Sequence, residues 1–180
     1  MKIAPATATL TTLCHDNLEQ LDGIDRLLAR IDAGDYTMPQ SAADPIGKHV
    51  RHVLEHYESL LQGTDGSIDY ESRARDPAVE ADPGVARERI ASIRERLVAL
   101  AETGAPESIR VRYTPAGGDH AVSDIESTLE RECHFVLSHT VHHMALIALL
   151  AQRHGRAVPE DFGVAGSTLR YRAASAAAAP

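Results

Sequence analysis

The sequence predicts an all-α protein: a four-helix bundle with one long crossover loop and a small β-hairpin before the last long helix. Along four segments apolar residues recur at steps of three and four, the period of one helix face. With no tryptophan and two phenylalanines, the core must be mainly aliphatic, which suits closely packed helices. A chain of 180 residues can form one domain with a sizeable core. We expect a single domain over residues 1–172 and a disordered, alanine-rich tail over residues 173–180.

Residues that begin or end helices bound the first two predicted helices. The first is predicted over residues 8–33, and Gly34 suits the position that follows a helix end. The second is predicted to begin at Asp44, a good capping residue, with Pro45 as its first helical residue. Gly63 is expected to end it.

A polar connection over residues 64–83 leads to the third helix. It is longer than bundle packing needs, and connections of such length are often functional or disordered. Two of its arginines, Arg73 and Arg75, are candidates for binding an anion. The third helix is predicted over residues 83–102, with Gly104 as its stop.

A small β-hairpin is predicted before the fourth helix. Residues 109–114 alternate between apolar and polar side chains, which is typical of a strand. Residues 115–119 carry the proline and glycines of a turn, and residues 120–123 suit a short return strand. The fourth helix is predicted to begin at the capping-box pattern of Ser123 and to run to His154.

Histidines gather on two of the predicted helices. His139 and His143 lie four residues apart in the apolar stripe of the fourth helix, so both imidazoles are on one face. On the second helix, three more recur at steps of three and four: His49, His52 and His56. If the two helices face each other, three imidazoles converge on one metal ion. Histidines that are simply hydrogen-bonded in the core remain the alternative, because spacing alone fits both interpretations.

Three histidine ligands leave coordination positions open, as in catalytic rather than structural zinc sites. Imidazole also suits nickel and iron, so we expect a divalent transition metal (zinc, nickel or iron). The residues between His139 and His143 include no glutamate, so the more specific HExxH pattern is absent from this segment. Ligand histidines must be neutral, and metal affinity should therefore fall below about pH 6.

Composition argues against several classes of protein. The formal net charge is −8, whereas binding to nucleic acid or anionic membranes favours basic patches. We expect no membrane span, because no stretch of about 18 residues is free of charged or strongly polar groups. The first residues lack the apolar run of a signal peptide, so a cytoplasmic location is expected by elimination. Cys14 and Cys133 form no CxxC pair and are expected to be buried thiols.

Two motifs in this order on a four-helix pattern resemble the DinB-like superfamily, which includes YfiT-like proteins regarded as metal-dependent hydrolases. The motifs are IGKHVRHVL at residues 46–54 and SHTVHH at residues 138–143. The resemblance extends from the first helix to about Gly155. It implies a four-helix bundle in which a metal is held by one histidine of the second helix and two of a later one. By position these are His52, His139 and His143.

The chain departs from the common family pattern directly after these histidines. Many members continue with Arg-Gly-Gln, where this chain has MALI at residues 144–147. The pocket at that turn is therefore expected to be more apolar than in those members.

Known family activities include bacillithiol- or mycothiol-dependent transferases and isomerases, and metal-binding domains of sulfoxide synthases for thiol-histidines. The resemblance therefore implies a thiol-dependent transferase or hydrolase acting on a small molecule, with a low-molecular-weight thiol as cosubstrate, in a homodimer. In such an enzyme His49 or His56 would transfer protons, and Arg73 or Arg75 would bind an anionic substrate. The alternative is a non-catalytic, stress-related bundle that binds metal or acts as a scaffold. A nucleic-acid-associated damage protein is disfavoured by the acidic balance.

Overall fold

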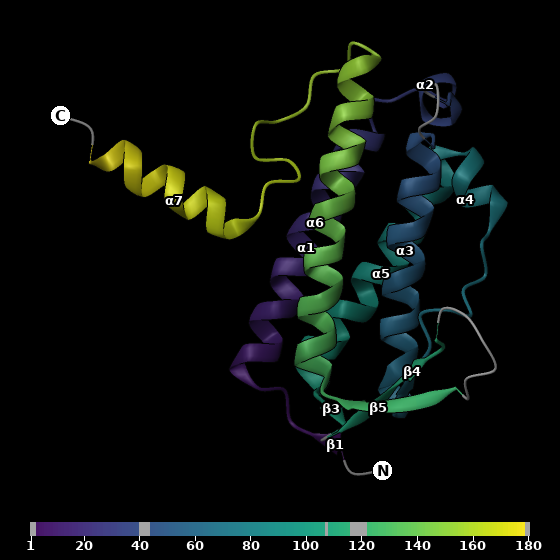
Figure 1. Ribbon diagram of the computed structural model, residues 1–180, viewed down its shortest axis with the longest axis vertical. Helices are drawn as coiled ribbons and strands as arrows, with labels where there is room; N and C mark the ends of the chain where they lie inside the picture. Colours follow the sequence, from purple (N-terminus) through teal and green to yellow (C-terminus); the bar gives the residue numbers. More distant parts are fainter. Residues whose placement is uncertain (1–2, 40–43, 107, 116–121, 179–180) are drawn as a thin grey trace.

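The protein is mostly helical in the computed structural model (Figure 1), which describes residues 3–39, 44–106, 108–115 and 122–178. Within these residues the longest elements are the helices α1 (Ala8–Leu28), α3 (Ile46–Gln62), α5 (Pro83–Thr103) and α6 (Leu129–Arg153). α1 packs against α5 and α6, and α3 packs against the same two helices. The apolar stripes that the periodicity predicted meet between them in an aliphatic core, which includes Leu21, Ile24, Val53, Leu60, Ile93, Leu97, Val136 and Ile147.

A buried polar network crosses this core and joins three of the long helices. The Tyr57 hydroxyl of α3 donates to Asn17 Oδ1 of α1 at 2.9 Å and accepts from Thr140 Oγ1 of α6 at 3.1 Å. Asn17 Nδ2 in turn donates to the carbonyl of Cys133 at 3.2 Å. Buried polar groups that find partners only in one arrangement fix the register of the helices that carry them. Because Thr140 directly follows His139, this network also fixes the position of His139 along α6 relative to α3.

A three-stranded sheet lies at one end of the long helices (Figure 1). Its central strand β4 (Ile109–Tyr113) pairs in parallel with β2 (Ser67–Ile68) and antiparallel with β5 (Ser123–Ser127). In the antiparallel pair Arg110 lies opposite Glu126 and Arg112 opposite Asp124, and opposite charges in such positions stabilise a ladder. A second sheet pairs β1 (Ile3–Ala4) with β3 (Ala105–Pro106).

The predicted start of the last long helix at Ser123 is wrong. Residues Ser123–Ser127 form strand β5, and α6 begins at Leu129. Thr128 caps it, since its side chain accepts a hydrogen bond from the backbone N–H of Arg131 at 3.2 Å. The local capping-box pattern gave no sign of the charged partners on β4. Of the predicted turn and return strand, residues 116–121 lie outside the described residues.

Three further predicted boundaries differ from the structure. The second long helix begins at Ile46, and Pro45 rather than Asp44 is at the capping position, where no side chain caps the helix. The first long helix ends at Leu28 rather than at residue 33, because Asp32 caps a separate short helix, α2 (Ala33–Thr37), which contains Gly34. The connection after α3 is also more ordered than predicted. It contains a 3₁₀ turn η1 (Gly63–Asp65), strand β2 and helix α4 (Pro77–Ala81), which Asp76 caps.

The chain ends in helix α7 (Gly166–Ala177), which extends away from the long helices (Figure 1) and has no buried residue. The sequence predicts a disordered tail from residue 173, and in the structure α7 continues across residues 172 and 173. Alanine has the highest helix propensity of all residues, and this accounts for the continuation. Residues 179–180 lie outside the described residues, and the extent of the domain stays a prediction.

Within the described part of the chain, α6 is the one helix long and apolar enough to cross a membrane by length and composition alone. Its mean hydropathy is 1.4 over an 18-residue window. The core helix of a helical domain passes the same test, and α6 packs against α1 and α3. The expectation of a chain without a membrane span therefore stays a prediction.

Candidate metal centre

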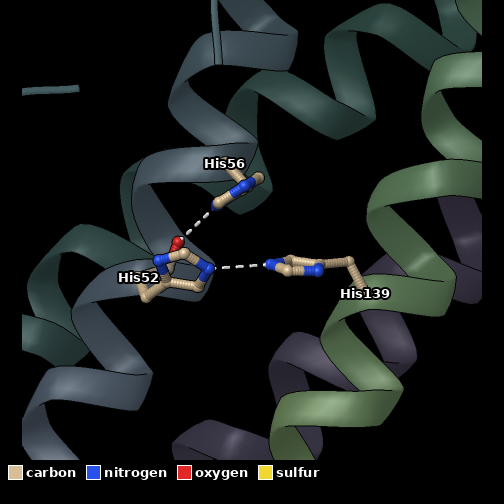
Figure 2. Close-up of side chains that lie close together, drawn as sticks. All are labelled: His52, His56 and His139. Carbon is tan, nitrogen blue, oxygen red and sulfur yellow. Dashed lines mark hydrogen bonds between the residues drawn. The ribbon is translucent and has the colours of Figure 1, made fainter. Parts of the chain in front are cut away.

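Three histidines meet between α3 and α6 (Figure 2): His52 and His56 from α3, and His139 from α6. One ring nitrogen from each lies within 4.8 Å of the others. His52 Nε2 and His139 Nε2 are 2.9 Å apart, and the ring centroids of His56 and His139 are 4.3 Å apart. Zinc binds imidazole nitrogens at about 2.0–2.1 Å, so nitrogens a few ångströms apart suit a shared ion. The donor set therefore fits a transition metal.

His49 and His143 extend this cluster by one turn along the same helices. The ring centroid of His143 lies 4.6 Å from that of His52 and 4.6 Å from that of His139. Its Nδ1 is 3.1 Å from His49 Nδ1. His142, which directly precedes His143 on α6, is exposed. The structure thus brings all five predicted histidines together, and whether His56 or His143 is the third ligand stays a prediction.

Burial keeps these imidazoles neutral. It lowers the pKa of His52 to about 3 and that of His56 to about 4. The charges of neighbouring histidines and of Arg73 act in the same direction, whereas the hydrogen bond of His56 to the His52 carbonyl raises the pKa of His56. Burial likewise lowers the pKa of His143 to about 3, and it lowers the pKa of His139. A neutral imidazole has one ring nitrogen with a free lone pair, which is the form that binds a metal.

The contacts of the three rings define where their protons lie. His56 Nδ1 is 2.7 Å from the carbonyl oxygen of His52 (Figure 2), so this nitrogen carries the proton, and Nε2 is the acceptor. Arg73 Nη1 lies 3.0 Å from His52 Nδ1, and 3.1 Å and 3.3 Å from Nδ1 and Nε2 of His56. A guanidinium only donates, so His52 Nδ1 accepts, and His52 carries its proton on Nε2. That nitrogen donates to His139 Nε2.

Of the two arginines predicted to bind an anion, the structure brings Arg73 to the histidines. Arg75 is exposed and has a left-handed backbone with a φ of 51°. Adjacent residues in an irregular loop can point in very different directions, and the sequence pattern alone did not separate the two.

Comparison with known proteins places this site within a family. Residues 19–147 match the model of the DinB superfamily. The chain belongs to the DinB superfamily. It is also similar to FK506-binding protein 5 of Rhizopus delemar, with 28% identity over 104 residues, 58% of this chain and 27% of the relative. The chain therefore spans about a quarter of that relative's length. No solved structure gives a significant match.

In this DinB-superfamily protein a cavity of about 400 Å³ opens beside the histidines. Its wall combines aromatic and aliphatic side chains with three arginines and two glutamates, and is lined by His52, His56, His139, Tyr70, Glu71, Arg73, Val111, Arg112, Tyr113, Ile125, Arg131, Glu132 and Phe135. The size is typical of a small-molecule site. Residues from the loop after α3, from the hairpin and from α6 all contribute, so the cavity exists only in the folded chain.

Sequence reasoning gave no role to Glu132, which is 1% exposed and also lines this cavity. Its carboxylate accepts hydrogen bonds from the Tyr70 hydroxyl at 3.0 Å, from Ser127 Oγ at 2.6 Å and from Arg131 Nη1 at 2.8 Å. Tyr70 then stacks on His56, with ring centroids 5.5 Å apart. The available signal was an acidic residue seven positions before His139, within an otherwise apolar stripe.

Proposed function

We propose that this DinB-superfamily protein is a metal-dependent enzyme acting on a small molecule. The observation that carries the proposal is the approach of ring nitrogens of His52, His56 and His139 to within 4.8 Å of one another beside a cavity. His52 and His139 are the two ligands that the local geometry and the family resemblance have in common. His56 is the third by geometry, and His143 is the third by resemblance. Zinc, nickel and iron all suit such donors.

The proposed reaction is a thiol-dependent transfer or a hydrolysis, with a low-molecular-weight thiol as cosubstrate in the first case. When bound, the metal would supply Lewis acidity and lower the pKa of a water or thiol ligand. His49, or His56 where it is not a ligand, would accept the proton. Arg73 would bind an anionic group of the substrate.

The remaining expectations from the sequence belong to the same proposal. The four long helices would form a four-helix bundle of the DinB type, in a cytoplasmic homodimer without nucleic-acid or membrane partners. The net charge of −8 supports the absence of such anionic partners.

Elemental analysis of protein purified without a histidine tag tests the metal directly. We expect about one transition-metal ion per chain, and much less in His139→Ala. His134→Ala is the matched control, because His134 is an exposed histidine of the same helix. Substoichiometric metal that His139→Ala leaves unchanged would refute the proposal.

A non-catalytic metal-binding protein is the second candidate. The number of imidazoles in the cluster favours it. The His143 ring lies as close to that of His52 as to that of His139, so His143 could be a fourth ligand that leaves no coordination position open. Cobalt-loaded protein separates the two functions. An open site gives a new sulfur-to-cobalt absorption band when a small thiol such as mercaptoethanol is added, whereas a closed site gives none.

A further inference from the structure

Arg73 is a cation without a carboxylate partner among the described residues. Its Nη1 contacts His52 and His56, and its Nε is buried without a hydrogen-bond partner. The other two arginines of the cavity differ: Arg112 lies 3.6 Å from Asp69, and Arg131 lies 2.8 Å from Glu132. The charges of Glu55 and Glu71 act on the pKa of Arg73, but in the described part of the chain no salt bridge joins either carboxylate to it, so this partly buried guanidinium is placed to take an anion from outside the chain.

The hydrogen bond of Arg73 to His52 uses the lone pair that a metal would need. A neutral imidazole offers one lone pair, and Arg73 Nη1, 3.0 Å from His52 Nδ1, uses that of His52. Against His56 it lies 3.1 Å from Nδ1 and 3.3 Å from Nε2. Coordination of a metal by His52 therefore requires Arg73 to withdraw from it. This conclusion holds for both ligand sets, because His52 belongs to each.

The segment that carries Arg73 is held at both ends. Tyr70 is hydrogen-bonded to Glu132 of α6 at 3.0 Å, and the backbone N–H of Asp76 donates to Glu55 Oε1 of α3 at 3.0 Å. Both anchors are hydrogen bonds to glutamates, so Arg73 can leave the imidazoles by rotating its own side chain while Tyr70 stays stacked on His56. Arg73 itself lines the cavity beside the histidines, so a guanidinium that leaves the rings has space there.

The side chains that line the cavity indicate which chemical groups a ligand should carry besides its anionic group. Phe135 stacks on His139 with ring centroids 5.8 Å apart, and Tyr70 lies 5.3 Å from Phe135. Ile125 and Tyr113 of the hairpin line the same cavity and are 52% and 49% exposed. Exposed apolar side chains around a polar centre are typical of a binding surface. An apolar or aromatic body fits this wall, and one anionic group fits Arg73.

We propose that Arg73 couples metal loading to substrate binding: it occupies the lone pair of His52 in the metal-free protein, and on metal loading it turns to bind the carboxylate of an aromatic or aliphatic acid. The inference rests on the proposed function and adds its substrate class and the order of binding. In this scheme the metal binds first and the organic anion second.

Isothermal titration with 3-phenylpropanoate tests this order. We expect the zinc-loaded protein to bind the acid at least about 10-fold more tightly than the metal-free protein. The neutral 3-phenylpropanamide should bind weakly to both forms. Equal affinity of the acid for the two forms would overturn the proposal, and so would equal binding of the acid and the amide.

The variant Arg73→Gln distinguishes the role of Arg73 from direct binding of the carboxylate to zinc. The zinc-loaded variant should lose at least about 10-fold in affinity for the acid, and it should bind zinc at least as tightly as the original chain. Arg75→Gln is the matched control, because it removes the same charge from an exposed position of the same loop. If zinc-loaded Arg73→Gln binds the acid as the original does, the proposal is wrong.

A separate calorimetric titration of the metal-free protein with zinc distinguishes failure of the proposed metal site from failure of the proposed role of Arg73. If zinc does not bind at the histidines, the proposed function itself fails. If zinc binds but leaves the affinity for the acid unchanged, only the role of Arg73 fails.

Discussion

His52 Nε2 and His139 Nε2 lie 2.9 Å apart, although 87 positions separate the two residues in the chain. Their contact joins α3 to α6 at the point where the cavity opens. An ion bound by both rings would replace one hydrogen bond between the helices by two coordinate bonds. If the proposed ion binds here, this pair would contribute both to metal affinity and to the stability of the α3–α6 interface.

Single histidine variants should identify the ligands. His52→Ala and His139→Ala should weaken zinc binding by more than the about 10–100-fold that loss of an outer partner costs. The third ligand is whichever of His56→Ala and His143→Ala causes a loss of the same size, measured by competition with a zinc chelator. His134→Ala should leave the affinity unchanged. Comparable losses below 10-fold in all four variants would mean that no ion is shared by these rings.

Metal removal should lower thermal stability. An ion that binds only the folded state, present at 100 times its dissociation constant, stabilises that state by about 2.7 kcal/mol. For a chain of this size we expect the melting temperature to fall by about 5–10 °C on chelation. Calorimetry with and without chelator measures this. The His139→Ala variant provides the control, since chelator should not change its melting temperature, and a shift in that variant would place the ion elsewhere.

The stability of the metal-free protein should decrease as the pH falls from 7 to 5. The pKa values of His52 and His56 are lowered to about 3 and about 4 in the folded state, whereas in the unfolded chain they stay near 6.5. Below pH 6.5 the unfolded state therefore binds more protons, and acid favours unfolding. The effect is fully absent above the unfolded pKa and grows as the pH approaches the folded values.

Urea denaturation at several pH values measures this dependence. The variant His52→Gln should have a shallower slope between pH 5 and 7, because it removes one of the depressed groups. A slope identical to that of the original chain would show that this histidine is not depressed in the fold.

The sequence was sufficient for features that local periodicity determines. The steps of three and four that predicted the long helices also put His49, His52 and His56 on one face of α3. The sequence was insufficient where contacts with residues distant in the chain determine the local structure. Strand β5 depends on pairing with β4, which put Asp124 opposite Arg112, and the capping-box pattern at Ser123 concealed it.

The same limit applies to the site. Spacing alone could not rank His56 against His143, because both rings lie within 5 Å of those of His52 and His139. The contact between Tyr70 and Glu132 joins residues 62 positions apart in the chain, and no local sequence pattern predicts it. Loop residues reach the site through such contacts, and these become visible only in the folded chain.

The hydrogen bond between Tyr70 and Glu132 should stabilise the loop that carries Arg73. Burial and the charge of Glu132 raise the pKa of Tyr70, so its hydroxyl donates at every physiological pH. Tyr70→Phe should cost about 0.5–1.5 kcal/mol of unfolding free energy, the usual net value of one such bond. Glu132→Gln should cost more, about 1–3 kcal/mol. The amide has one acceptor oxygen in place of the two carboxylate oxygens, so it cannot accept hydrogen bonds from all three of Tyr70, Ser127 and Arg131.

A double-mutant cycle isolates the pair from the other partners of Glu132. If the bond is made as described, the double variant Tyr70→Phe with Glu132→Gln should be more stable than the sum of the single losses implies, by about 0.5–1.5 kcal/mol. Ser127→Ala combined with Tyr70→Phe is the matched comparison, because these two hydroxyls contact different carboxylate oxygens. Strict additivity in the first cycle, measured by urea denaturation, would mean that Glu132 does not hold Tyr70 against His56.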